Sequence, residues 1–167
     1  MTRPGYITIE QLRAMEAGKG KTNRAIKKGQ PKVNYNLLCA LPQWKAETQF
    51  GVTSYTLPMP PSANTYWRNL NGKTVVSQEA KEYKEEIAKL ADRLGMRPAQ
   101  GNVGIMLQVY RQQKSGDLDN RIKVTLDALR GIAFNDDSQV TEIHAFRYDD
   151  KDNSRIVISI TDFSKGK

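Results

Sequence analysis

The chain has 167 residues, 38% of them hydrophobic, a size that suits one globular domain and leaves no room for a second full one. Its 26 Lys and Arg against 18 Asp and Glu give a net charge of +8, which would attract nucleic acid or an anionic membrane surface. Nucleic acid is the expected partner, because no basic amphipathic helix with an apolar face is found. Cys39 is the single cysteine, which excludes a disulfide framework and a Cys-based zinc site and makes a reducing cytoplasm the expected compartment. No window of about 18 apolar residues occurs, which excludes a membrane-spanning helix.

The first fifty residues carry most of the excess charge, with nine Lys and Arg against three Glu. Residues 8–15 predict a short helix capped by Thr8, and residues 18–32 have the composition of a basic linker. A solvated tail and a DNA-tracking arm both fit this composition. We therefore predict a basic, partly flexible extension at 1–50 and a folded domain at 51–167.

From residue 51 the hydrophobic pattern alternates between strand and helix periods. The predicted strands cover 52–57, ended by Pro58, then 73–76, 103–109, 139–148 and 155–160. The predicted helices cover 77–94, closed by Gly95, and 118–133, with an apolar face of Leu118, Ile122, Leu126, Leu129 and Ala133. Residues 62–71 predict a loop, and the last two strands predict an antiparallel hairpin. The order implies an α+β (mixed α/β) domain in which helices pack on a single mixed β-sheet.

An acidic motif stands out in this basic chain where the second predicted helix begins. Asp117 and Asp119 precede Lys123, and Asp136 and Asp137 follow the helix. An in-line phosphodiester displacement needs a nucleophilic water and a leaving oxygen whose charge is neutralised, and Mg²⁺ held by carboxylates provides both. Because residues two apart point about 200° apart on a helix, we expect Asp117 before or at the cap, where both side chains converge. Asp136 or Asp137 is expected to reach the same point from the loop after the helix. Lys123 would then contact a phosphate oxygen or the attacking water.

Each of these residues also has an ordinary structural explanation. Asp117 is a good helix cap, Asp119 and Lys123 form a common surface pair, and residues 136–138 make an ordinary turn. Asp127 fits a third metal ligand and a solvated helix face equally well.

Three other residues have weaker functional signals. His144 has no second His or Cys partner and is expected to be a structural histidine. Tyr66 and Trp67 are expected to anchor a loop rather than to stack on bases.

Three segments, at 57–64, 117–129 and 135–140, contain further motifs. The first is Leu-Pro-Met-Pro-Pro-Ser-Ala-Asn, followed by Tyr66. The second contains Asp-Leu-Asp-Asn, then Lys123, and ends in Asp-Ala-Leu, and the third is Asn-Asp-Asp-Ser-Gln-Val. Together these segments resemble the RusA family of Holliday junction resolvases, which are often phage-borne. The resemblance covers about residues 53 to 163 in the family's order.

The resemblance implies a homodimeric, Mg²⁺-dependent endodeoxyribonuclease, with Mn²⁺ as a substitute ion, that cuts a four-way junction by symmetric paired nicks. The family's carboxylates fall on Asp117, Asp119 and Asp137 as metal-binding and catalytic residues, with Asp136 in reserve, and its functional lysine falls on Lys123. The basic residues predicted to contact DNA are Lys19, Lys21, Arg24, Lys27, Lys28, Arg68, Lys73, Arg111, Lys114 and Arg121.

The chain departs from the family pattern in three places. The loop before Asp117 has Arg111 and Lys114 but no arginine cluster, the connection between 129 and 136 is short, and the first fifty residues are additional. The basic extension is therefore a candidate source of phosphate contacts. Two other functions remain open at this point: a less selective branched-DNA or flap nuclease, and a non-catalytic basic nucleic-acid-binding accessory protein.

Overall fold

The computed structural model describes residues 33–112 and 117–166. The helices and strands lie within those ranges. The helices are α2 (Tyr35–Cys39), α3 (Ala63–Tyr66), α4 (Gln78–Arg93) and α5 (Leu118–Leu129), with the 3₁₀ turns η1 (Asp137–Gln139) and η2 (Phe163–Gly166). The strands are β1 (Lys45–Gln49), β2 (Val52–Pro58), β3 (Trp67–Leu70), β4 (Lys73–Val76), β5 (Val103–Arg111), β6 (Val140–Asp149) and β7 (Arg155–Asp162). The predicted helix at 8–15 and the basic linker lie outside the described residues.

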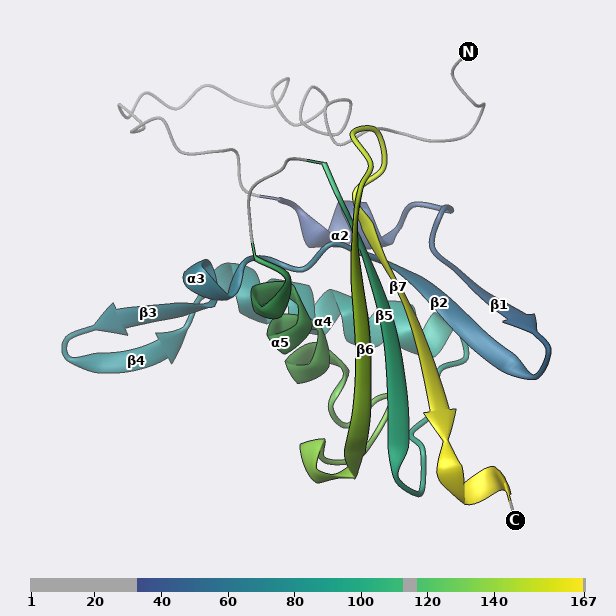
Figure 1. Cartoon of the computed structure of the whole chain (residues 1–167). Coiled ribbons are helices and arrows are strands. Elements are labelled where there is room, and N and C mark those ends of the chain that lie inside the picture. Colours follow the sequence, from purple (N-terminus) through teal and green to yellow (C-terminus); the bar gives the residue numbers. More distant parts are fainter. Residues whose placement is uncertain (1–32, 113–116, 167) are drawn as a thin grey trace.

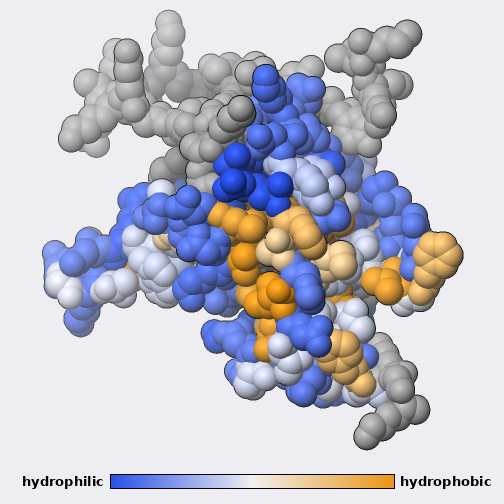
Figure 2. All heavy atoms as spheres, in the orientation of Figure 1, coloured by the Kyte–Doolittle hydropathy of each residue, from blue (hydrophilic) through white to orange (hydrophobic). Residues whose placement is uncertain are grey.

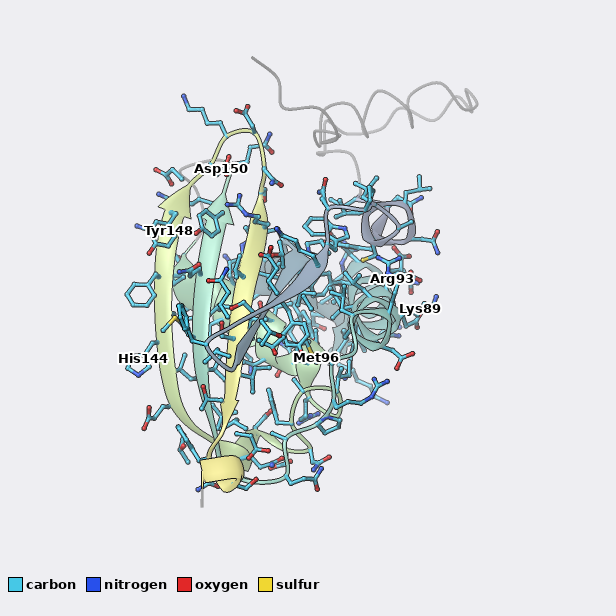
Figure 3. The ribbon with its side chains drawn as sticks, turned by 90° about the vertical axis from the view of Figure 1, so that its right-hand side faces the viewer. Lys89, Arg93, Met96, His144, Tyr148 and Asp150 are labelled. Atoms are coloured by element: carbon cyan, nitrogen blue, oxygen red, sulfur yellow. The ribbon has the colours of Figure 1, made fainter. Side chains whose placement is uncertain are left out.

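Five strands form one mixed sheet in the order β1-β2-β7-β5-β6, and β3 pairs with β4 in a separate hairpin. The helices lie on one side of the large sheet, and the other side faces solvent (Figures 1 and 3). The alternating residues Val103, Ile105, Leu107 and Val109 of β5 are buried under the helices. The predicted α+β fold with a single mixed sheet is confirmed.

The predicted pairing of the last two strands is wrong. β5 lies between β6 and β7, and it runs parallel to β6 and antiparallel to β7. The turn after β6 crosses the end of β5, where the Asp150 amide donates to the Arg111 carbonyl at 2.8 Å. β5 and β7 have the more completely buried apolar faces and occupy the interior of the sheet, while β6 takes an edge.

Helix α4 confirms its prediction at both ends. Ser77 caps it by accepting a hydrogen bond from the Ala80 amide at 3.2 Å, and Gly95 follows it with a φ of 75°. Its buried face includes Tyr83 and Ile87, which pack in the core between helices and sheet. Complete burial of apolar side chains of this kind stabilises the fold by about 1.5–3 kcal/mol each.

The part of the predicted extension from 35 to 49 belongs to the folded unit. α2 buries Leu38 and Cys39, and the buried Trp44 indole donates to the Leu38 carbonyl at 2.6 Å. Burial and then Glu86 raise the pKa of the Cys39 thiol to about 12, so this thiol is protonated and unreactive at neutral pH. The described domain therefore begins before residue 51, because these apolar side chains complete the core.

The predicted loop at 62–71 instead contains α3 and β3. Asn71 and Gly72 have φ values of 52° and 76°, the positive values that a two-residue hairpin turn requires. They join β3 to β4, whose predicted extent at 73–76 is confirmed. The hairpin projects from the body of the protein on the side where α3 and α5 lie (Figure 1). No helix among the described residues is both long and apolar enough to cross a membrane.

Candidate active site

Helix α5 carries the centre of the acidic motif, but it is shorter than predicted. It ends at Leu129 because Arg130 has an extended backbone and Gly131 has a φ of 81°. Its most buried residues are Val124, Thr125, Ala128 and Leu129, so the core-facing stripe is rotated relative to the predicted one. Leu118, Ile122 and Leu126 are only partly buried and flank that stripe.

An alternating charged stripe runs along α5. Asp119, Lys123 and Asp127 follow one another at spacings of four, which places them on one face of α5, and Arg130 comes directly after the helix. The Lys123 Nζ lies 3.9 Å from an Asp127 carboxylate oxygen, and the Arg130 guanidinium lies 3.6 Å from Asp137. The stripe therefore continues beyond the end of the helix to the second acidic group.

Asp117 and Asp119 lie together at the N-terminal end of α5. Asp117 occupies the N-cap position with extended backbone, but its side chain makes no capping hydrogen bond. Both residues are exposed, and neither side chain has a hydrogen bond or ion pair with another described residue. The structure thus gives the Asp117 carboxylate no capping role, and both carboxylates remain accessible to a ligand.

Asp136 and Asp137 have different surroundings at the other end. Asp136 caps η1 by accepting a hydrogen bond from the Ser138 amide at 3.0 Å, and Gln139 completes a capping box. These hydrogen bonds from Ser138, assisted by Arg130, lower the pKa of Asp136 below its ordinary value. Asp137 faces Arg130 instead. Asp137 is therefore the better ligand candidate of the two, because the carboxylate of Asp136 is already used by the turn.

The two acidic groups lie far apart in one chain. From Asp119 to its end at Leu129 the helix rises by about 15 Å, and Asp137 lies beside Arg130, the next residue. Gln139 reaches the carbonyls of Ala99 and Gly101, just before β5, whereas Asp117 comes after the end of β5. Since β5 has nine residues, its first and last residues are about 26 Å apart.

The predicted metal-ligand set is consequently not assembled within a single copy. No three Asp, Glu, His or Cys side chains of residues 33–112 and 117–166 are grouped closely enough to hold a metal ion. Asp117 and Asp119 provide one half of the predicted set, and Asp137 lies at the opposite end of the helix.

The predicted DNA-contacting residues within the described ranges have unequal access. Arg68 and Lys73 are exposed on the projecting β3–β4 hairpin. Arg111 forms an ion pair with Asp149 at 2.6 Å and is largely buried. Lys114 and the five basic residues between 19 and 28 lie outside the described residues.

Arg121 requires a correction, because it is turned inward and not toward solvent. Its guanidinium donates to the Pro60 carbonyl, and burial lowers its pKa below the ordinary value while Tyr35 and Tyr83 oppose that shift. This position takes Arg121 out of the set available to DNA and gives it a structural role between α5 and the Pro60 segment.

Sequence reasoning missed the surroundings of Tyr66. Its ring is buried, packs edge-on against Trp67, and lies near Asp127 and Arg130. Burial, and then Asp127, raise the Tyr66 pKa, while Arg130 opposes the shift. Tyr66 thus anchors the base of the hairpin beside the charged stripe, as expected of a loop anchor, whereas Trp67 is 45% exposed.

Comparison with known proteins identifies the family. The family model described as endodeoxyribonuclease RusA matches residues 58–161, which include the acidic motif. The crossover junction endodeoxyribonuclease RusA of Escherichia coli strain K12 is 31% identical over 117 residues, covering 65% of this chain and 93% of that protein. The proteins of the same name from Enterobacteria phages 82 and HK97 are each 29% identical, covering 64% and 65% of this chain and 92% of each relative. The chain therefore belongs to the RusA family of endodeoxyribonucleases.

Proposed function

We propose that the chain is an endodeoxyribonuclease that resolves four-way DNA junctions by symmetric paired nicks. The observation that carries the proposal is the family match, which extends from the end of β2 into β7 and spans α5 and both acidic groups. The relatives that it resembles are named crossover junction endodeoxyribonucleases. The net charge of +8 supports a polyanionic substrate.

The chain's own residues supply binding and positioning in this proposal. Lys123 offers an exposed ammonium group between two carboxylates of the α5 stripe, where it can neutralise a phosphate oxygen. Arg68 and Lys73 place positive charge on the projecting hairpin, where they can contact the DNA backbone. We also propose a requirement for Mg²⁺, with Mn²⁺ as a substitute, and a homodimer whose two-fold symmetry matches that of a four-way junction.

The test compares a synthetic four-way junction with linear duplex of the same sequence, in Mg²⁺ and in EDTA. Paired cuts at the junction that need Mg²⁺ and spare the duplex are the expected result. Equal cutting of both substrates would replace the proposal with a general nuclease. Tight junction binding without cutting at any Mg²⁺ concentration would replace it with a binding protein.

Removing residues 1–32 is expected to weaken junction binding and to flatten its salt dependence. For every phosphate that the extension neutralises, its deletion should reduce the slope of log affinity against log salt by about 0.9. The measurement is a binding titration at several salt concentrations, and the matched control is the full-length chain with Lys19, Lys21, Arg24, Lys27 and Lys28 changed to Gln. Unchanged affinity and slope in both variants would show that the extension makes no phosphate contacts.

A further inference from the structure

The two tryptophans of the chain have different surroundings. Trp44 is buried, and its indole N–H donates to the Leu38 carbonyl at 2.6 Å, as expected of a structural tryptophan. Trp67 is 45% exposed, and its indole N–H has no hydrogen-bond partner among the described residues. It is therefore a large aromatic side chain that is available for a contact from outside the fold.

The Trp67 ring is held in place at the root of the β3–β4 hairpin. It packs edge-on against the Tyr66 ring, with the ring centroids 5.0 Å apart and an angle of 67° between the planes. Tyr66 is buried, and its carbonyl accepts a hydrogen bond from the Ser77 amide at 2.7 Å, which closes the base of the hairpin. A ring fixed in this way loses little conformational entropy when it binds, so it suits a stacking contact.

The same tyrosine links Trp67 to the charged stripe of α5. Helix α3, which ends at Tyr66, packs against α5, and Asp127 and Arg130 lie close enough to Tyr66 to shift its pKa. Asp127 in turn lies 3.9 Å from Lys123, the lysine proposed to contact a phosphate. Trp67 therefore lies on the hairpin side of the candidate active site, where one DNA strand can contact both the ring and the lysine.

The hairpin around Trp67 is basic and hydrophilic. Residues 67–76 contain Arg68 and Lys73, both exposed, and no acidic residue. In Figure 2 the region where Figure 1 draws β3 and β4 is predominantly blue and white, whereas the orange atoms gather near the centre of the view. An aromatic residue beside two cations on a mainly hydrophilic surface matches nucleic acid better than an apolar protein partner.

A base face is accessible only where DNA departs from a continuous duplex. In a linear duplex both faces of every internal base are covered by the neighbouring base pairs, and extruding a base is costly. The branch point of a four-way junction interrupts this stack. A stacking side chain therefore finds a binding site at a branch point that a linear duplex does not offer.

We propose that Trp67 stacks on a nucleobase exposed at the branch point, with Arg68 and Lys73 on the adjoining phosphates, and that this contact makes the chain prefer branched DNA to linear duplex. The inference deepens the proposed function and rests on it. It assigns Trp67 a role in substrate specificity, while the chemistry of cutting stays with the acidic groups and Lys123.

Binding titrations in EDTA, which separate recognition from cutting, test this assignment. Trp67→Leu keeps an apolar side chain but removes the aromatic face. It is expected to weaken junction binding by about 5- to 140-fold and to leave binding of a linear duplex of the same sequence within about twofold. Trp67→Phe should keep most of the junction affinity. Phe50→Leu, which changes a fully exposed aromatic residue in the β1–β2 turn, is the matched control and should bind both DNAs as the wild type does.

The outcomes separate the stacking contact from the nuclease function. Circular dichroism first verifies that each variant folds. A Trp67→Leu chain that keeps the wild-type preference for the junction, or Leu and Phe variants with equal losses, would overturn the stacking contact, and wild-type cutting of the junction in Mg²⁺ would leave the function standing. A wild type that neither binds nor cuts the junction would remove the function and the inference with it.

A duplex with one unpaired nucleotide separates base exposure from four-way geometry. The wild type is expected to bind this DNA more tightly than the perfect duplex, because the unpaired base is the least costly to unstack. The Trp67→Leu variant should bind the two duplexes equally. Equal binding of both by the wild type would contradict stacking on an exposed base.

Tryptophan fluorescence provides a direct signature of the contact. Junction binding in EDTA should quench the emission of the exposed Trp67, while the buried Trp44 contributes a constant signal. The Trp67→Phe variant should bind the junction without this quenching. Quenching that persists in the variant, or a junction-bound wild type with unchanged emission, would show that Trp67 does not contact the DNA.

Discussion

Asp119→Asn is expected to reduce junction cleavage by more than about 100-fold while leaving junction binding within a few-fold of wild type. Loss of a group that only supports a metal ligand typically costs about 10–100-fold in activity, and loss of a ligand should cost more. The neutral amide retains the shape of the carboxylate but is a weaker ligand for a divalent cation. The measurements are single-turnover cleavage of the four-way junction and a binding titration with the same substrate.

Asp92→Asn is the matched control for this prediction. Asp92 is also exposed and acidic, but it lies near the C-terminal end of α4, where it pairs with Arg97 beyond the helix. Its substitution should leave cleavage unchanged. If Asp119 instead served only as a favourable charge in the first turn of α5, the substitution would lower stability by about 0.3–1 kcal/mol and leave cutting intact. That outcome would remove Asp119 from the proposed site.

The elements that the sequence predicted correctly are those whose periodicity is set by burial on one face. β5 alternates buried and partly exposed residues along its length, and α4 repeats buried residues at helical spacing between a serine cap and a glycine. Such signals are local, so a single sequence contains them. The Asn71-Gly72 pair is also a local signal, typical of a hairpin turn, but the prediction assigned residues 62–71 to a loop and did not use it.

Strand pairing is not a local property, and the prediction failed there. β6 and β7 are adjacent in sequence with a charged turn between them, a pattern that favours a hairpin. The structure separates them because β5 packs between the two and buries its apolar face against the helices. Residues 35–49 were misplaced for a related reason: the basic composition of the first fifty residues outweighed the few apolar residues, such as Leu38 and Trp44, that complete the core.

The site was predicted as a set of residues and not as an arrangement. Spacing placed Asp117 before or at the cap of the helix, and the structure has it at the N-cap of α5 with Asp119 in the first turn. The same reasoning brought Asp136 or Asp137 to that end of the helix, whereas Arg130 holds Asp137 at the other. Helix length alone separates them, because twelve residues in α5 span about 18 Å.

Lys123→Met is expected to slow junction cleavage by about 10²–10³-fold, the usual cost of removing one charge-stabilising donor from an active site. The Lys123 side chain is 60% exposed and its oxygen partner on Asp127 is 3.9 Å away. An exposed pair of this kind contributes less than about 1 kcal/mol to stability. Urea unfolding should therefore detect little change while cleavage falls steeply, and the two measurements together separate a catalytic charge from a structural one.

Lys84→Met on α4 is the matched control, since Lys84 is likewise an exposed helical lysine but lies away from the α5 stripe. It should cut the junction at the wild-type rate. Lys123→Arg distinguishes the role further: recovery of cleavage would indicate that positive charge suffices, and continued loss would indicate that the compact ammonium group is required. Equal cleavage by the Lys123→Met variant and the wild type would mean that Lys123 only pairs with Asp127, and the proposed contact with the scissile phosphate would have to be abandoned.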